Sequence, residues 1–258
     1  MSDEGSAALE ARDIGLRFGT FVALEGVSLT FRRGGITGIV GPNGAGKSTL
    51  FNVLGGQLRP DRGSVLLDGR DITRRPPHAR ARHGLTRTFQ ISRELGALTV
   101  LENLLLASPR QPGEQVFAAL LNGPSVRRAE EEAIARARAL LQRVNLWRLA
   151  DAPANALSGG QKKLLELCRA LMLEPRVVLL DEPAAGVNPV LVGELGDFIR
   201  TLRDEGLSFG IVEHNMDLIA ALCDPIHVLA EGRVLTSGSF GEISSNSRVT
   251  EAYLGGVA

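Results

Sequence analysis

The chain of 258 residues contains the stretch Gly41-Pro42-Asn43-Gly44-Ala45-Gly46-Lys47-Ser48-Thr49. It matches the pattern G-x-x-x-x-G-K-[ST] in full and directly follows an apolar run at 36–40. The pattern requires this order of buried strand, glycine loop and helix, because backbone N–H groups and the helix N-terminus bind phosphate oxygens. We expect Lys47 to reach the β- and γ-phosphates and the Ser48 hydroxyl to bind Mg²⁺. The plainer alternative, a glycine-rich turn that matches by chance, does not explain the strand and helix on either side. The stretch therefore predicts a nucleotide-binding site.

A second motif is the apolar run Val177-Val178-Leu179-Leu180, which ends in Asp181 and Glu182. Such a run is typical of a parallel-sheet strand that is buried on both faces. An Asp at the carboxyl end of that strand would lie beside the phosphate loop and could hold Mg²⁺. Glu182 would face the γ-phosphate and could polarise the attacking water. Alone, the motif could equally be a strand followed by a solvated loop; the phosphate loop favours the functional interpretation.

A third motif is Leu157-Ser158-Gly159-Gly160-Gln161. A serine hydroxyl, two glycine N–H groups and a helix N-terminus can form a second anion site. One ATP has a single triphosphate, which the first loop already surrounds, so a second site suggests that another subunit contributes to it. The alternative for any Ser-Gly-Gly is an ordinary helix N-cap.

The remaining patterns predict an α/β fold. Alternating residues predict strands at 9–16, 22–31 and 64–68, the last ending in an Asp68-Gly69 hairpin turn. Helices are expected at 47–54, 97–107, 156–173 and 189–203, and a strand is expected at 208–213. Prolines bound a surface insertion at 111–123, after which Ser125 is expected to cap a long helix. The apolar positions expected on that helix are Val126, Ala129, Ala133, Ile134, Ala137, Leu140, Leu141 and Val144.

Composition limits the classes of protein that are compatible with the chain. Its 29 basic and 29 acidic residues cancel, which argues against a nucleic-acid partner. Cys168 and Cys223 have no metal-ligand spacing and are expected to be free thiols in a reducing compartment. The acidic N-terminus lacks the apolar region of a signal peptide, and no run approaches the roughly 18 apolar residues of a membrane span. Any membrane role is therefore expected to come through a partner.

Five motifs in this order resemble the ATPase subunits of ABC transporters: the phosphate loop, Gln90, residues 157–161, residues 177–182 and His214. The resemblance covers essentially the whole chain. It implies a P-loop ABC ATPase core with a parallel sheet, an antiparallel β region and a helical subdomain. The implied single domain spans 1–258, with the core and β lobe at about 1–90 and 174–258 and the helical subdomain at about 91–173. It also implies a head-to-tail dimer of ATPase subunits, identical or different, that holds two ATP molecules between phosphate loop and signature loop.

The resemblance also implies roles for single residues. Gln90 would contact Mg²⁺ and link to the membrane subunit, and His214 would lie near the γ-phosphate. Phe18, 29 residues before Lys47, would stack on adenine. Without the resemblance, the plainer interpretations are a core residue for Phe18, a strand-end histidine for His214 and a surface residue for Gln90. The resemblance further implies that Lys47, Glu182 and His214 are catalytic and that Ser158–Gln161 bind the other subunit's nucleotide.

Several local stretches are similar to the bacterial importers of branched-chain (hydrophobic) amino acids. These stretches are Arg87–Gln90, Thr99–Leu104, Asp181–Pro189, Glu213–Asp217 and Glu251–Gly255. Asn188 departs from the Asp that the wider family usually carries; the importers often share this Asn, so we interpret it as a mark of the subfamily. The resemblance implies permease subunits in the membrane, a substrate-binding protein and a peripheral position on the cytoplasmic face of the plasma membrane. Alternatives are ATPases for urea or amide import or lipopolysaccharide export, and a soluble ABC protein outside transport.

Overall fold

The computed structural model describes residues 6–88, 95–109 and 124–254. Its first sheet is antiparallel, with the strand order β2-β1-β4-β5. These strands are β1 (Ala7–Phe18), β2 (Phe21–Arg32), β4 (Arg62–Leu67) and β5 (Arg70–Asp71). Asp68 and Gly69 join β4 to β5 with positive φ angles of 48° and 74°, as a two-residue hairpin turn of mirror-image type requires. The predicted hairpin is confirmed.

The second sheet has the order β10-β9-β3-β8-β7-β6. Its strands are β3 (Ile36–Val40), β6 (Leu85–Arg87), β7 (Val177–Asp181), β8 (Ser208–Val212), β9 (Ile226–Ala230) and β10 (Arg233–Gly238). All neighbours are parallel except β9 and β10. The carboxyl ends of β3, β8, β7 and β6 therefore meet at one edge, where ligands bind in open α/β sheets. The expected combination of a parallel sheet with an antiparallel β region is confirmed.

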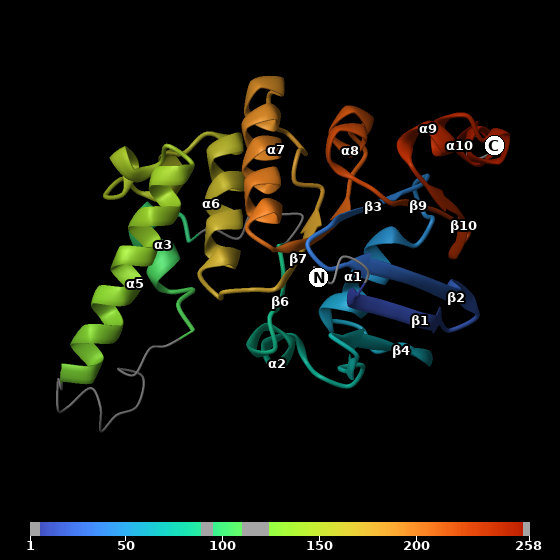
Figure 1. The fold of residues 1–258 in the computed structure, drawn as a ribbon, viewed down its shortest axis with the longest axis horizontal. Coiled ribbons are helices and arrows are strands. Elements are labelled where there is room, and N and C mark those ends of the chain that lie inside the picture. Colours follow the sequence, from blue (N-terminus) through green and yellow to red (C-terminus); the bar gives the residue numbers. More distant parts are fainter. Residues whose placement is uncertain (1–5, 89–94, 110–123, 255–258) are drawn as a thin grey trace.

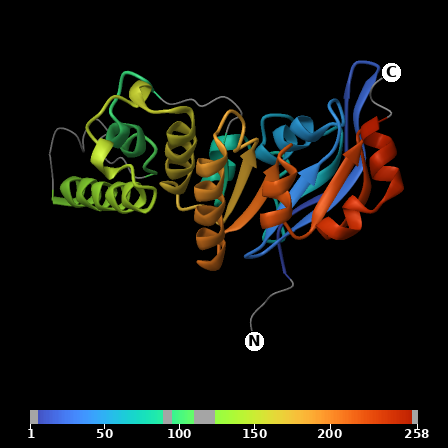
Figure 2. The ribbon, with the colours of Figure 1, turned by 90° about the horizontal axis from the view of Figure 1, so that it is seen from above.

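Helices α3 and α5 lie at one end of the molecule, and α9 and α10 lie at the other (Figures 1 and 2). The helices are α1 (Lys47–Gly55), α2 (Pro77–Arg82), α3 (Val100–Leu105), α5 (Pro124–Arg143), α6 (Gly159–Leu171), α7 (Pro189–Asp204), α8 (Met216–Leu222), α9 (Phe240–Ser244) and α10 (Ser247–Leu254). Short 3₁₀ turns lie at Trp147–Leu149 and Ala154–Ala156. None of the helices in the described ranges combines the length and the apolar character needed to cross a membrane.

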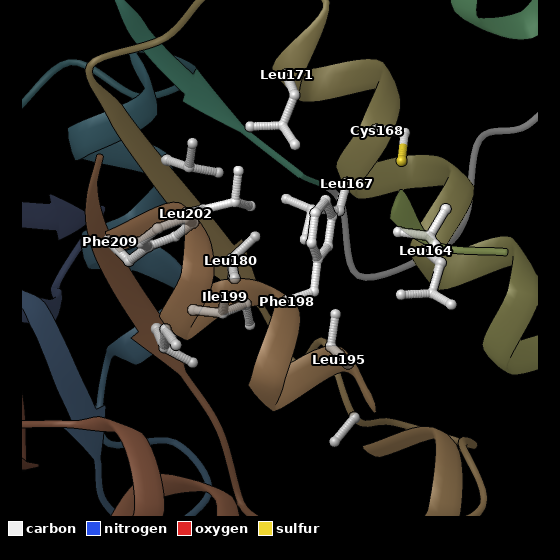
Figure 3. Packing of buried hydrophobic residues seen from close by; sticks show 14 of the residues in the cluster. Leu164, Leu167, Cys168, Leu171, Leu180, Leu195, Phe198, Ile199, Leu202 and Phe209 are labelled. Atoms are coloured by element: carbon white, nitrogen blue, oxygen red, sulfur yellow. The ribbon is translucent and has the colours of Figure 1, made fainter. Parts of the chain in front are cut away.

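Strand β7 separates the two hydrophobic cores. Side chains alternate across a strand, so Val177 and Leu179 pack into the core shared with the antiparallel sheet and α1. Val178 and Leu180 pack into the second core, against the helices. Figure 3 shows Phe198 of α7 between the leucines of α6 and the side chain of Leu180. All five residues of β7 are buried, and this burial on both faces places Asp181 rigidly at the sheet edge.

Three expectations about elements need correction or addition. The long helix α5 begins at Pro124, so Ser125 lies inside it and is not its N-cap; proline fits a first helical position because its missing N–H has no partner there. Ile134, expected on the apolar face, is 43% exposed, because the face that packs is carried by Ala137, Leu140 and Leu141. The short polar tail beyond Gly238, for which no element is predicted, forms α9 and α10. The expected insertion at 111–123 lies outside the described residues.

Candidate nucleotide-binding site

The glycine loop follows β3 and opens α1 at Lys47, as the motif predicts. Gly44 and Gly46 have φ angles of 77° and 98°, which side chains with a Cβ rarely adopt. At Gly41, a Cβ would lie 2.1 Å from the carbonyl oxygen of Leu229, so only glycine fits there. No side chain caps the N-terminus of α1, and its first N–H groups are left for an anion.

Lys47 is buried beneath this loop. Its ammonium donates hydrogen bonds to the carbonyl oxygens of Gly41 at 2.7 Å and Pro42 at 2.9 Å. Burial lowers the pKa of Lys47, while the neighbouring carboxylates of Glu182 and Asp181 raise it. The structure therefore brings the lysine of the first motif and both carboxylates of the second into one electrostatic cluster.

Asp181 ends β7 and is held by an arginine that sequence reasoning did not single out. Arg87, on the adjacent strand β6, donates to Oδ2 of Asp181 at 2.7 Å and also to Oδ1 of Asn52 on α1 at 2.7 Å. The side chains of Arg87 and Asp181 are only 9% and 2% exposed. The other oxygen of Asp181, Oδ1, is buried and has no hydrogen-bond partner among the described residues.

The buried Oδ1 of Asp181 shows whether the residues of this site fit a Mg²⁺ ion. A carboxylate oxygen without a donor, next to a phosphate-binding loop, is a ligand of the hard oxygen type that Mg²⁺ prefers. Ser48 follows Lys47 at the start of α1 and offers a hydroxyl. Because Mg²⁺ keeps several waters and substrate oxygens, two protein ligands suffice, and the residues fit the ion. Gln90, the third expected ligand, lies outside the described residues.

Glu182 and His214 face each other across neighbouring loops. Nε2 of His214 lies 3.4 Å from Oε1 of Glu182, and the two side chains are 46% and 20% exposed. Glu182 has a φ of 48°, a left-handed conformation that is uncommon for any residue with a side chain. Strained backbone of this kind is concentrated at functional sites. The pair is thus partly open to solvent on the side of the sheet edge that carries the phosphate loop.

Phe18 lies at the end of β1 and is 50% exposed. The plainer interpretation of Phe18 as a core residue is therefore wrong. Its cross-strand partner is Phe21, which is 63% exposed and which sequence reasoning passed over. Two exposed rings on one hairpin tip offer stacking surface, although adenine stacking by Phe18 stays a prediction.

Ser158 and Gln161 form a capping box at the N-terminus of α6. Oγ of Ser158 accepts from the N–H of Gln161 at 3.4 Å, and Oε1 of Gln161 accepts from the N–H of Ser158 at 3.0 Å. Gly159 and Gly160 open this helix, and a Cβ at Gly160 would lie 2.4 Å from Leu191. In the single chain the motif is an N-cap. A role of this motif as an anion site completed by a second subunit stays a prediction.

Two further residues near the site have structural contacts. Oδ1 of Asn188 accepts from the N–H of Leu191 at 3.0 Å, so Asn188 caps α7. Burial raises the pKa of the Tyr253 phenol, and a backbone hydrogen bond from Gly41 lowers it. The contact brings α10 to the start of the phosphate loop, which no sequence pattern indicated.

Comparison with known proteins agrees with this geometry. A family model described as ABC transporter matches residues 24–185. The chain is 42% identical over 96% of its length, and 95% of the relative's, to an Archaeoglobus fulgidus protein named "Probable branched-chain amino acid transport ATP-binding protein LivG". It is 40% identical over 96% of its length, and 97% of the relative's, to the Pseudomonas aeruginosa high-affinity branched-chain amino acid transport ATP-binding protein BraF.

A solved structure of a nucleotide-free ATP-binding cassette from an ABC transporter superposes with a TM-score of 0.84 and 37% identity, over 96% of this chain and 98% of that chain. The structure of an ADP-bound conformation of such a cassette also gives a TM-score of 0.84, with 36% identity over 97% of this chain and 99% of that one. Both matches extend across the two sheets and the helices. This chain belongs to the ABC transporter family, as one of its ATP-binding cassettes.

Proposed function

We propose that this chain binds and hydrolyses ATP to power an importer of branched-chain or other hydrophobic amino acids. The observation that carries the ATPase assignment is the meeting of the glycine loop, Asp181, Glu182 and His214 at one edge of the central sheet. The substrate class rests on the relatives named above, which are 40–42% identical over 96% of the chain.

The nucleotide is held by the loop between β3 and α1. Backbone N–H groups from Gly41 to Thr49, with the N-terminus of α1, bind the phosphate oxygens. The Lys47 ammonium, now bonded to two loop carbonyls, exchanges them for the β- and γ-phosphates, because an ionised acceptor is the stronger partner. The exposed ring of Phe18 stacks on the adenine.

Asp181 Oδ1 and the Ser48 hydroxyl are the side-chain groups that would hold Mg²⁺, with Gln90 as a further ligand by resemblance. When bound, the ion neutralises negative charge on the phosphate oxygens. Arg87 keeps Oδ2 of Asp181 engaged, which turns Oδ1 toward the ligand side. This ion pair orients the carboxylate.

Glu182 orients and polarises the water that attacks the γ-phosphate. Its carboxylate is one-fifth exposed and reaches past the end of β7, where a water can approach. His214 lies within 3.4 Å of that carboxylate and fixes its rotamer from the neighbouring loop. Lys47 stabilises the charge that develops on the transferred phosphoryl group.

The complete site requires a second ATPase subunit, identical or different. Ser158, Gly159 and Gly160 would close on the γ-phosphate bound to the partner, since they form a helix N-terminus that can bind an anion. Permease subunits span the membrane, a substrate-binding protein delivers the amino acid, and this chain lies on the cytoplasmic face.

Transport and hydrolysis can be tested separately. The complex is co-expressed with its neighbouring permease genes, purified and reconstituted in vesicles with its binding protein. Leucine uptake that requires ATP enclosed within the vesicles and is abolished by Lys47→Ala is the expected result. ATPase activity without uptake of leucine, isoleucine or valine would contradict the proposed substrate class but leave the ATPase assignment intact.

A further inference from the structure

Glu213 is a buried carboxylate with no part in the nucleotide binding, Mg²⁺ binding or hydrolysis proposed above. It directly follows β8, and 4% of its surface is exposed. Oε1 accepts a hydrogen bond from the backbone N–H of Ala184 at 2.7 Å. Oε2 accepts from the N–H groups of His214 at 2.6 Å and Asn215 at 2.9 Å. One side chain therefore joins the loop after β7 to the loop after β8.

The loop after β7 carries Glu182 in its left-handed conformation, with φ at 48°. Backbone strain of this kind persists only where the surrounding structure holds it. The N–H of Glu182 donates to Val212 at 2.9 Å, and its carbonyl oxygen accepts from Ala185 at 3.1 Å. The bond from Ala184 to Glu213 ties the same turn to the neighbouring loop, so Glu213 is one of the groups that maintain the strained conformation.

The loop after β8 carries His214. Because one oxygen of Glu213 accepts from two successive N–H groups, it sets the direction in which His214 leaves the strand. Asn215 continues this arrangement, since its side chain accepts from the N–H of Leu218 and caps α8. The backbone on both sides of the 3.4 Å contact between His214 and Glu182 is thus bonded to a single carboxylate.

We propose that Glu213 is a positioning residue that holds Glu182 and His214 in register for hydrolysis. It acts through the backbone of the two loops and does not touch the nucleotide. This assignment rests on the proposed role of Glu182 and His214 in ATP hydrolysis. The hydrogen bonds by which Glu213 joins the two loops, called the bridge below, do not depend on that role. The competing explanation is a turn cap at the end of β8, which needs only the bonds to His214 and Asn215.

Two substitutions separate these explanations. Glu213→Asp keeps the charge and can still accept from the adjacent N–H groups of residues 214 and 215, as Asp does in Asx turns, but is one methylene too short to reach Ala184. Glu213→Gln keeps the length but replaces one acceptor oxygen with an NH₂ group, which cannot accept. Ser208→Ala is the matched control. It removes a buried acceptor at the opposite end of the same strand, where Ser208 accepts from the N–H of Gly34 at 2.9 Å.

The first measurement needs no nucleotide. Amide hydrogen exchange of the full chain reports the N–H of Ala184 directly, and Glu213→Asp should exchange it about tenfold faster than the parent. Glu213→Gln, which keeps one acceptor oxygen, should exchange faster either at Ala184 or at residues 214 and 215. Ser208→Ala should leave this exchange unchanged. The second measurement is steady-state hydrolysis, in which both variants should lose about tenfold or more in kcat, since small misplacements of catalytic groups have effects of this size. The dissociation constant for Mg²⁺-free ATP should change less than about twofold.

The outcomes distinguish the bridge from the turn cap and from the proposed function. An Asp variant with fast exchange at Ala184 but the parent's kcat overturns the positioning role. Parental exchange at Ala184 in both variants shows that the bridge does not exist. If the parent itself hydrolyses no ATP, the proposed function fails, while the exchange experiment still decides whether Glu213 joins the two loops.

Discussion

At the scale of single residues, the site depends on carboxylates whose surroundings differ although they are adjacent in sequence. Asp181 is almost fully buried and paired with Arg87, whereas Glu182 is partly open and contacts His214. The buried carboxylate is suited to hold a cation in a fixed position, and the open one can meet water. This difference arises because β7 ends at Asp181 and the backbone turns into a left-handed conformation at Glu182.

Glu182→Gln is expected to bind ATP with parental affinity and to lose nearly all turnover. The amide keeps the size of the side chain but cannot act as a base toward water. The blocked protein should accumulate as an ATP-bound dimer in gel filtration. A variant that retains more than about a tenth of the parent's kcat would remove Glu182 from this role, since losing a general base normally costs at least 10²-fold.

Arg87→Met is expected to lower the free energy of unfolding by about 3 kcal/mol, because it leaves the Asp181 carboxylate buried without its cation. Adding Asp181→Asn removes that uncompensated charge, so the double variant should recover much of the loss. Urea denaturation of the parent, the two single variants and the double variant measures the coupling free energy between Arg87 and Asp181. Strictly additive losses would mean that the ion pair has no energetic coupling.

At the scale of elements, helix α1 ends at a left-handed Gly56, and the carbonyl oxygens of its last turn are bound by a residue distant from it in sequence. Arg80 of α2 is 1% exposed and donates to the carbonyl oxygens of Val53 and Leu54, the last turn of α1, at 2.7 and 2.5 Å. It also donates to Arg75 and Thr73. Burial lowers the pKa of Arg80 to about 10, with Asp71 acting in the opposite direction. A cation at a helix C-terminus is favourable, so Arg80 anchors the helix whose other end binds phosphate.

Arg80→Met should therefore destabilise the protein by about 3 kcal/mol, because several buried carbonyl oxygens lose their donor. Arg82→Met, an exposed position on the same helix, is the control and should change the free energy of unfolding by less than about 0.5 kcal/mol. Thermal or urea unfolding measures both. Equal stability of the two variants would show that Arg80 does not anchor α1.

At the scale of the whole molecule, the motifs divide into two groups. The phosphate loop, Asp181, Glu182 and His214 meet at the edge of the central sheet. Ser158 is the N-cap of α6, a helix that lies between α5 and α7 (Figure 1). The boundaries of a helical subdomain at about 91–173 stay a prediction. The separation of the motifs is the reason that a second subunit enters the proposal.

Mixing Ser158→Ala with Lys47→Ala should restore about one active site per heterodimer. If Ser158 acts on the partner's nucleotide, one interface of the heterodimer retains both an intact phosphate loop and an intact signature loop. Each variant alone should be inactive, and the rate should rise with the fraction of heterodimer measured by native mass spectrometry. An inactive mixture with proven heterodimer would indicate that the two sites are obligatorily coupled or act entirely within one chain.

The sequence by itself determined the elements whose signals are local. The glycine loop, the apolar strand before Asp181, the Asp68-Gly69 turn and the order of the family motifs need only neighbouring residues to be recognised. Two local predictions were wrong: Ser125 is not the N-cap, because α5 already begins at Pro124, and Ile134 is exposed, because the packing of α5 against its neighbours selects the buried face. Propensity is a weak guide where tertiary contacts compete with it.

Only the tertiary structure decided which distant residues serve the site. Arg87 reaches Asp181 from 94 positions away, and Glu213 reaches Ala184 from 29 positions away. Neither contact has a sequence signature, because an arginine or glutamate acquires its partner through the order of parallel strands, not through spacing along the chain. The carboxyl ends of β6, β7 and β8 are neighbours in the sheet although long connections separate them in sequence, and this adjacency assembles the site.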